Sequence, residues 1–177
     1  MKRYILTGTP GAGKTSIIRI LETMDYFVIE EAATDIIALE QTLGNKEPWL
    51  MPLFIDKIVN LQKQRQVQLS CAQSRMQFFD RSPLCTYALC QYLGYQYPSS
   101  LLEEIDRIEK KQIYQKKVFF IENLGVCKPT EARKISFEES LYFEKVHEEV
   151  YNFFGYECIK IPQQAIQNRV NQIIALV

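Results

Sequence analysis

Residues 3–16 read RYILTGTPGAGKTS, and this stretch decides the fold of the chain. Gly8 to Thr15 fit the pattern G-x-x-x-x-G-K-[ST], a glycine-rich turn between a strand and a helix. The glycines let the backbone bend until successive N–H groups point inward, toward β- and γ-phosphate oxygens. The helix that follows adds the positive end of its dipole. The stretch therefore predicts a phosphate-binding loop that joins a strand over Arg3–Thr7 to a helix beginning at Lys14.

The residue types in this loop indicate a nucleoside triphosphate as the ligand. We expect Lys14 to reach the β- and γ-phosphates and the Thr15 hydroxyl to ligate Mg²⁺. The alternative is a glycine turn with an incidental Lys-Thr pair, but the motif stands where it must, after the first strand and at a helix start. The residues predicted to bind the nucleotide, ATP with Mg²⁺, are Gly8, Thr9, Pro10, Gly11, Ala12, Gly13, Lys14, Thr15 and Ser16.

Strand and helix signals alternate along the rest of the chain. Short apolar runs predict strands at Arg3–Thr7, Tyr26–Glu30, Met76–Phe79, Lys117–Ile121 and Tyr156–Ile161. Helical periodicity predicts helices at 14–24, 32–43, 51–74, from 83 onward, 100–112, 136–154 and 166–177. Capping signals at helix starts are Ser82 with Pro83, Ser100 with Glu103, and Ser136 with Glu139. This alternation predicts one α/β domain over residues 1–177, a five-stranded parallel sheet with helices on both faces.

Composition and charge exclude several classes of protein. The chain has 177 residues, of which 47% are hydrophobic and 24% charged, so it is neither disordered nor collagen-like. Its 21 basic and 21 acidic side chains balance, which argues against an extended nucleic-acid surface and against an anionic membrane as partner. No apolar run approaches the roughly 18 residues of a membrane span. The five cysteines contain no CxxC pair, so we expect free thiols in a reducing, cytoplasmic compartment.

Asp80 and Arg81 follow the third predicted strand. Because ligands of open α/β sheets sit outside the carboxyl ends of the strands, Asp80 should emerge beside the phosphate-binding loop. A carboxylate there can hold Mg²⁺ directly or through water, and Arg81 can pair with phosphate through two hydrogen bonds. The alternative is that Asp80 only caps the helix that starts near Ser82.

Glu30 and Glu31 end the second predicted strand. A carboxylate at this place can accept the proton of an acceptor hydroxyl, or position a water, during in-line phosphoryl transfer. Since side chains alternate along a strand, the two glutamates cannot both point into the cleft. The alternative is that one or both simply open the next helix, where acids favour its dipole.

A basic segment from Lys128 to Lys134 lies between the fourth predicted strand and the helix expected from Ser136. A mobile lid that supplies an arginine to the transition state would have this composition, and so would a solvated surface loop. His147, the single histidine of the sequence, lies among glutamates inside a predicted helix. We expect it to be a surface or packing residue rather than a base.

The chain resembles a small P-loop family of predicted ATPases and kinases related to the ribosylnicotinamide kinase domain of bacterial NAD-synthesis proteins. The matching segments keep their order over essentially the full length: TGTPGAGKTS, VIEEAATDII, FFDRSPLCTYALCQYLGY, KVFFIENL, EARKISFEES, GYECIKIP and IQNRVNQII. The resemblance implies a nucleoside- or nucleotide-kinase-like fold with strand order 2-3-1-4-5. It also implies that the segment near Ile161 and Pro162 lies close to the nucleotide base.

The resemblance further implies roles for individual residues. Glu31 corresponds to the acid of the segment after the second strand, Asp80 and Arg81 to the D-R pair, and Arg133 to the lid arginine. Thr34 stands where the family commonly has arginine, and this departure concerns the contact to a substrate phosphate or acceptor.

These features predict a Mg²⁺-dependent kinase that transfers the γ-phosphate of ATP to a small, nucleoside-like acceptor. The predicted catalytic residues are Lys14, Glu31, Asp80, Arg81 and Arg133, and the predicted metal ligands are Thr15 and Asp80. One alternative is an ATP or GTP hydrolase or switch that acts on a protein partner, although no NKxD-type guanine motif is present. Another is a nucleotide-binding module without catalysis, which the departure at Thr34 favours.

Overall fold

The computed structural model describes residues 1–68, 75–124 and 137–177 of the chain. Within them, parallel strands form a five-stranded sheet in the order β2-β3-β1-β4-β5. The strands are β1 (Lys2–Thr7), β2 (Phe27–Ile29), β3 (Met76–Asp80), β4 (Lys117–Ile121) and β5 (Glu157–Ile161). The α/β class, the parallel sheet and the strand order expected from the sequence are confirmed.

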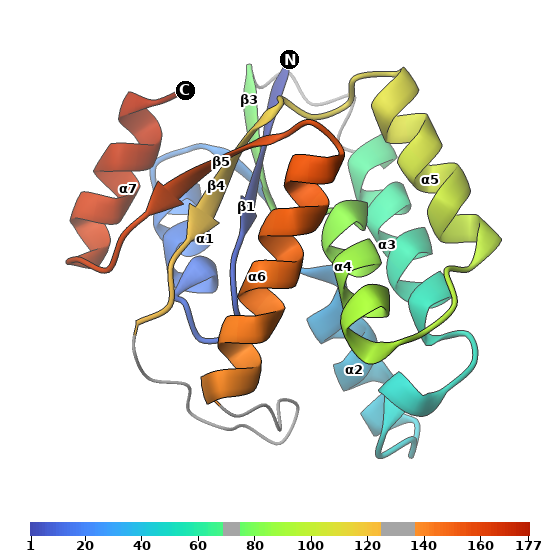
Figure 1. The fold of residues 1–177 in the computed structure, drawn as a ribbon. Coiled ribbons are helices and arrows are strands. Elements are labelled where there is room, and N and C mark those ends of the chain that lie inside the picture. The colour runs from blue at the N-terminus through green and yellow to red at the C-terminus, as the bar shows by residue number, and fades with distance from the viewer. Residues whose placement is uncertain (69–74, 125–136) are drawn as a thin grey trace.

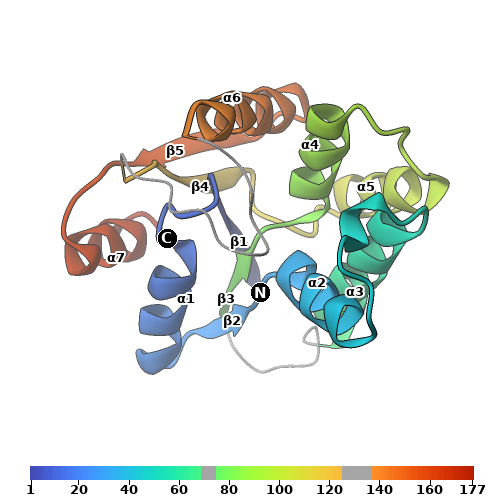
Figure 2. The same ribbon diagram turned by 90° about the horizontal axis from the view of Figure 1, so that it is seen from below.

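Helices cover both faces of this sheet (Figures 1 and 2). One face carries α1 (Lys14–Thr23) and α7 (Ile166–Ala175), which pack against each other. The helices on the other side are α2 (Ala32–Thr42), α3 (Phe54–Gln68), α4 (Pro83–Leu93), α5 (Ser99–Lys110) and α6 (Phe137–Phe153). A short 3₁₀ helix, Pro48–Leu50, lies between α2 and α3.

The central strand divides its side chains between two cores. Tyr4 and Leu6 belong to the cluster under α1 and α7, whereas Ile5 belongs to the cluster under the other helices. All three are at most 4% exposed. This is why residues 4–6 of β1 are all apolar, as expected of the part of a parallel strand that is buried on both faces.

The strand register brings the sequence signals to one edge of the sheet. In β1, Leu6 pairs with Asp80 of β3 and Thr7 pairs with Phe120 of β4. In β2, Ile29 pairs with Phe79, so Glu30 and Glu31 follow at the same edge. Figure 2 views the molecule from this side, where the loop between β1 and α1 lies.

The helix starts follow the predicted capping signals only in part. Ser82 caps α4 as expected, because its hydroxyl accepts a hydrogen bond from the Leu84 N–H at 3.2 Å. The predicted capping box at Ser100 is wrong: α5 begins at Ser99 with no side-chain cap, and the Ser100 hydroxyl donates to Asp56 of α3 at 2.6 Å. Ser136 lies outside the described residues. A tertiary contact has replaced a local one at Ser100.

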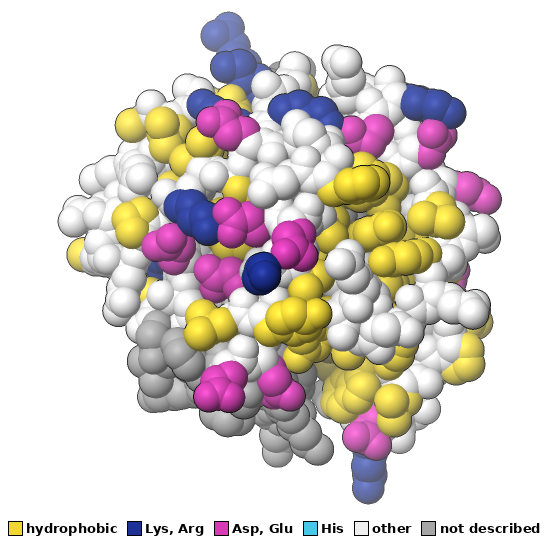
Figure 3. All heavy atoms as spheres, viewed as in Figure 1, with side chains coloured by type: hydrophobic (Ala, Val, Ile, Leu, Met, Phe, Trp, Pro, Cys, Tyr) yellow, Lys and Arg dark blue, Asp and Glu magenta, His cyan; other side chains and the backbone are white. Residues whose placement is uncertain are grey.

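The surface over α4, α5 and α6 is mixed in character (Figure 3). Apolar side chains gather on one part of this face, and these helices expose Leu93, Leu102 and Phe153. Acidic and basic side chains interleave on another part, and the ion pairs of this region include Lys160–Glu148 at 2.7 Å. No helix among the described residues combines the length and apolar character needed to cross a membrane.

Candidate functional site

The loop between β1 and α1 has the backbone geometry of a phosphate-binding loop. Gly8 has a φ of 129°, and a Cβ at this position would lie 2.2 Å from the carbonyl oxygen of Ile121. The loop thus passes so close to the end of β4 that it excludes a side chain at its first position. The first turn of α1 carries no side-chain cap among the described residues, so its N–H groups are available to an anion.

Lys14 is folded over this loop. Its side chain is buried, 6% exposed, and its Nζ donates to the carbonyl oxygens of Gly8 at 2.9 Å and Thr9 at 2.8 Å. Thr15 and Ser16, the next two residues of α1, are exposed. The loop therefore offers a cation, two hydroxyl groups and backbone donors at one end of a helix.

Asp80 is a buried carboxylate at the carboxyl end of β3. Burial raises its pKa to about 6, and Lys14 opposes this shift while Glu31 adds to it. Its Oδ1 atom is buried and makes no hydrogen bond to any described residue. Ser82, not Asp80, caps α4, so the capping alternative does not account for this side chain.

The donor set at this place fits a magnesium ion. Mg²⁺ is held in phosphoryl-transfer sites by one or two oxygen side chains together with phosphates and waters, rather than by a cage of protein ligands. Asp80 supplies a carboxylate oxygen without a partner among the described residues, and Thr15 supplies an exposed hydroxyl beside the lysine of the loop.

Glu31 and Arg81 form an ion pair across the carboxyl edge of the sheet. Glu31 Oε1 lies 2.5 Å from Arg81 Nε, and the Thr34 hydroxyl donates to Glu31 Oε2 at 2.8 Å. Burial opposes the charge on Arg81, but Glu31 and other nearby acidic groups outweigh it and raise the pKa of Arg81. Glu30, by contrast, is exposed, so the two glutamates point different ways as strand alternation requires.

Arg81 is held from two further directions. Its φ is +73°, a left-handed conformation that is uncommon outside glycine, and its backbone N–H donates to the Leu6 carbonyl at 3.0 Å. Its Nη1 lies 3.3 Å from Nε2 of His147, whose Nδ1 lies 2.9 Å from the Phe143 carbonyl. These partners agree with a neutral histidine that donates from Nδ1 and accepts at Nε2.

His147 is therefore a packing residue, one of the two outcomes expected from the sequence, but it also orients Arg81. It is 0% exposed, and burial together with the Arg81 charge lowers its pKa to about 3. No local sequence signal could have revealed this contact, because it depends on α6 packing against α4.

A buried hydroxyl–thiol chain beneath the site was also missed by sequence reasoning. The Tyr151 hydroxyl lies 2.8 Å from the Ser82 hydroxyl and 3.0 Å from the Cys85 thiol, which in turn lies 3.2 Å from the Thr7 hydroxyl. Cys85 is one of the free cysteines of the described residues. This chain of groups ties the start of α4 to α6 and to the end of β1, and so fixes the backbone that follows Arg81.

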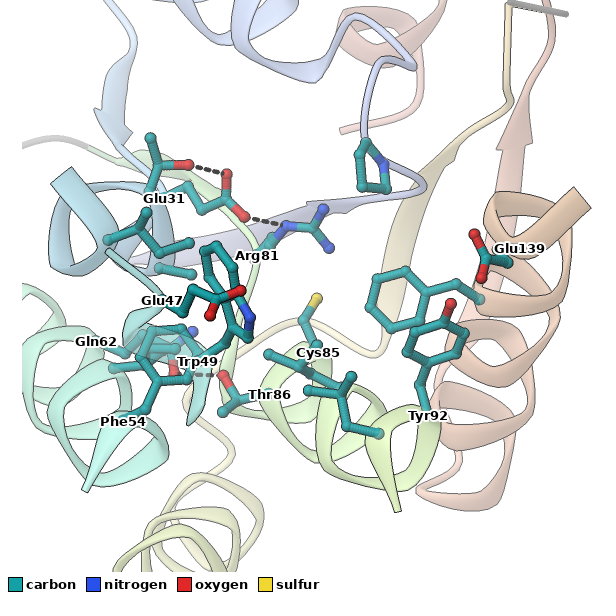
Figure 4. Close-up of a pocket in the computed structure, with 18 residues that line it drawn as sticks. Glu31, Glu47, Trp49, Phe54, Gln62, Arg81, Cys85, Thr86, Tyr92 and Glu139 are labelled. Atoms are coloured by element: carbon teal, nitrogen blue, oxygen red, sulfur yellow. Dashed lines mark hydrogen bonds and ion pairs between the residues drawn. The ribbon is translucent and has the colours of Figure 1, made fainter. Parts of the chain in front are cut away.

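A pocket of about 380 Å³ opens from this edge between α2, α3, α4 and α6 (Figure 4). Pro10 of the phosphate-binding loop, Glu31 and Arg81 line one end of it. Its apolar lining consists mainly of Ile37, Trp49, Phe54, Ile58, Leu89, Tyr92 and Phe143. Its other polar side chains include Glu47, Gln62, Thr86 and Glu139, and the Thr86 hydroxyl donates to Gln62 Oε1 at 3.1 Å. The volume and the largely apolar, aromatic lining suit a small organic molecule, one end of which would approach the loop.

The structure brings together most of the residues singled out in the sequence. Lys14 and Glu31 act on the pKa of Asp80, and Glu31 is paired with Arg81. The basic segment from Lys128 to Lys134, with Arg133, lies outside the described residues. The sequence did not select which aromatic residues line the pocket beyond Glu31, because its walls come from four separate helices and the 3₁₀ helix.

Comparisons with known proteins agree with this fold. Deoxyadenosine kinase from M. mycoides, solved with dCMP and dCDP, superposes with a TM-score of 0.64 and 18% identity over 98% of this chain and 97% of that one. NadR in complex with NAD and AMP-PNP gives a TM-score of 0.68 and 16% identity over 99% of this chain. NadR in complex with NR gives a TM-score of 0.67 and 17% identity over 98% of this chain. The chain spans about half of NadR, 48% and 49% in the two structures.

At these identities the similarity concerns the fold, which this chain shares with kinases that bind nucleotides. No curated protein matches the chain in sequence. The model of a protein family described as an AAA domain matches residues 3–169, which include the whole phosphate-binding loop and the Glu31, Asp80 and Arg81 positions. The chain is thus a P-loop nucleotide-binding domain, and it belongs to this AAA domain family.

Proposed function

We propose that the chain is a Mg²⁺-dependent kinase that transfers the γ-phosphate of ATP to a nucleoside-like acceptor. The observation that carries this proposal is the pocket of about 380 Å³ that begins at the phosphate-binding loop and ends among aromatic side chains. A hydrolase needs room for a water at this place, whereas a kinase needs a shaped site for a second substrate. The kinases that share the fold support the same reading.

The reaction assigns a task to each residue at the edge of the sheet. Lys14 and the loop N–H groups bind the β- and γ-phosphates, and Arg81 with Arg133 neutralises charge in the transition state. Glu31 orients the acceptor hydroxyl and takes its proton as the acceptor oxygen bonds to the γ-phosphorus and the bond to the β-phosphate oxygen breaks, releasing ADP. Thr15 and Asp80 would hold Mg²⁺, which supplies charge neutralisation at the phosphates when bound.

The acceptor is expected to be unphosphorylated. Arg81 is the one cationic side chain among the described residues that line the pocket, and Glu31 is already paired with it at 2.5 Å. The other charged side chains of the lining are the carboxylates of Glu47 and Glu139, which disfavour a phosphate group. Thr34, whose hydroxyl donates to Glu31, stands where the family that the chain resembles commonly has arginine, so the contact which that arginine would make to a substrate phosphate or acceptor is missing.

The first experiment is a measurement of ADP release from Mg·ATP, alone and with nucleosides and nucleotides added one at a time. Stimulation by a nucleoside, with less stimulation by its monophosphate, is the expected result. Trp49 is the single tryptophan of the chain and lines the pocket, so its fluorescence reports acceptor binding independently of turnover.

Glu31→Gln and Glu30→Gln form a matched pair for this assay. Glu31→Gln should reduce acceptor-dependent ADP release by about 100-fold or more, because the amide cannot take a proton. Glu30 is exposed, and its substitution should change the rate by less than about twofold. ADP release that needs no acceptor and is equal in both variants would instead identify a hydrolase or switch. Binding of ATP without any release would identify a binding module.

A further inference from the structure

Arg169 of α7 is a buried arginine that the proposed reaction does not use. It is 2% exposed and belongs to α7, which lies with α1 on one side of the sheet (Figure 1), whereas the helices that line the acceptor pocket are on the other side. An arginine stays charged in proteins and is seldom buried to this extent without a carboxylate partner. Its contacts therefore need an explanation.

The guanidinium of Arg169 binds backbone carbonyl groups from three separate segments. Nη1 donates to the oxygen of Ala12 in the phosphate-binding loop at 2.7 Å. Nη2 donates to the oxygen of Glu122, directly after β4, at 2.8 Å and to that of Ile161, at the end of β5, at 3.3 Å. Nε is buried and makes no hydrogen bond to any described residue. Burial lowers the pKa of Arg169, and the charge of Glu122 opposes this effect.

The bond to Ala12 determines the direction of a donor in the loop. A peptide unit is planar and trans, so the N–H of one residue points opposite to the C=O of the residue before it. Because Arg169 holds the Ala12 carbonyl on the outer side of the loop, the Gly13 N–H must point to the other side. In a phosphate-binding loop this is the side on which the anion lies.

Gly13 lies directly beside the arginine. Its φ is +89°, and a Cβ built on it would lie 3.4 Å from Arg169 Nη1, in van der Waals contact with the guanidinium. The absence of a side chain at Gly13 thus permits the backbone conformation that places this peptide beside the guanidinium. The fold thus brings together two residues that are 156 positions apart in the sequence.

We propose that Arg169 is the positioning residue of the phosphate-binding loop: it holds the Ala12–Gly13 peptide in its anion-binding orientation and adds positive charge behind the loop. The inference rests on the proposed binding of ATP at this loop. It predicts a role in affinity for the β- and γ-phosphates and none in the acceptor pocket, which lies on the other face of the sheet.

Arg169→Lys and Arg169→Gln test this role, with Arg107→Lys as the matched control. A lysine carries its three N–H donors on a single nitrogen and cannot reproduce the spread of two guanidinium nitrogens over three carbonyls. Arg107 also makes several hydrogen bonds, to Glu104 at 2.7 Å and Gln66 at 2.6 Å, but it lies on α5, far from the loop. Dissociation constants for Mg·ATP and for AMP are measured by calorimetry, acceptor binding is followed by Trp49 fluorescence, and folding is checked by circular dichroism.

We expect both Arg169 variants to weaken the binding of Mg·ATP at least tenfold and the binding of AMP less than threefold, since AMP lacks the phosphates that the loop holds. The acceptor affinity of the Arg169 variants should stay within twofold of the wild-type value, and so should the Mg·ATP affinity of the Arg107→Lys protein. A folded Arg169→Lys protein with wild-type affinity for Mg·ATP overturns the inference, and so does an equal loss for ATP and AMP. Failure of both variants to fold also overturns it, because Arg169 would then be a core residue only. Wild-type protein that does not bind Mg·ATP overturns the proposed function itself.

Discussion

At the scale of single residues, Gly8 shows how closely the phosphate-binding loop is built against the sheet. An alanine there would place its Cβ 2.2 Å from the Ile121 oxygen while keeping a φ of 129°. We expect Gly8→Ala to destabilise the protein by about 3 kcal/mol or more, from backbone strain and overpacking combined. Gly44→Ala is the control: φ is 95° but nothing lies within 4 Å of the new Cβ, so a loss of about 1 kcal/mol is expected. Urea unfolding of the two variants checks this, and equal losses would contradict the close approach.

His147 gives a residue-scale prediction about pH. Its pKa is about 3 in the folded protein against 6.5 for an unperturbed histidine, because it is buried and faces Arg81. Between these values the unfolded chain binds more protons than the folded one, so stability from this group is present above pH 6.5 and is lost as the pH falls. The loss amounts to about 1.4 kcal/mol for each pH unit.

His147→Gln removes this dependence. The glutamine variant should be less stable than wild type at pH 7.5, by about 1 kcal/mol for the altered hydrogen bonds, and the difference should shrink or reverse by about pH 5. Urea titrations at several pH values measure the difference directly. Parallel stability curves for the two proteins would show that the histidine is not buried as a neutral group.

At the scale of elements, the stability of α4 depends on the hydroxyl of Ser82, its N-cap residue. Ser82 is 1% exposed, caps the helix through the Leu84 N–H and also lies 2.8 Å from the Tyr151 hydroxyl. Ser82→Ala should cost about 1–2 kcal/mol of stability, since it removes a cap and leaves buried polar groups with fewer partners. Ser99→Ala, at the exposed and uncapped start of α5, should stay within about 0.5 kcal/mol of wild type. Thermal unfolding of both variants makes the comparison, and equal effects would refute the importance of the cap.

At the scale of the whole molecule, the nucleotide site joins three neighbouring strands. The loop follows β1, Asp80 ends β3, and Ile121 at the end of β4 packs against Gly8. A ligand bound here should therefore stabilise the sheet as a unit. Mg·ATP at about 100 times its dissociation constant adds about 2.7 kcal/mol, which corresponds to a rise in Tm of about 5–10 °C for a protein of this size.

Lys14→Ala should abolish most of this rise, because it removes the cation that is expected to bind the β- and γ-phosphates. Affinity for the triphosphate should fall at least tenfold, while the protein stays folded without ligand. Chelation of Mg²⁺ should reduce the rise in the wild-type protein as well. A wild-type rise in Tm on addition of Mg·ATP to a folded Lys14→Ala protein would contradict the assignment of this loop as the phosphate-binding site.

Much of the fold and part of the site were predictable from local signals. The glycine pattern predicted the loop, and runs such as KVFFI predicted strands, because both depend on neighbouring residues. The positions of Asp80 and Glu31 followed from a general rule, that carboxyl ends of parallel strands meet at one edge. The predicted capping box at Ser100 failed, because a hydroxyl that can cap its own helix can equally bond to another helix, here at Asp56.

By itself, then, the sequence determined the α/β class, the phosphate-binding loop and the set of charged residues at the ends of the strands. Only the tertiary structure decided that His147 supports Arg81, that Arg169 holds Ala12, and that aromatic side chains from several elements enclose one pocket. The physical reason is the range of the interactions. Turns and strands obey rules that act over a few residues, whereas a buried side chain finds its partner through the packing of whole helices on the sheet.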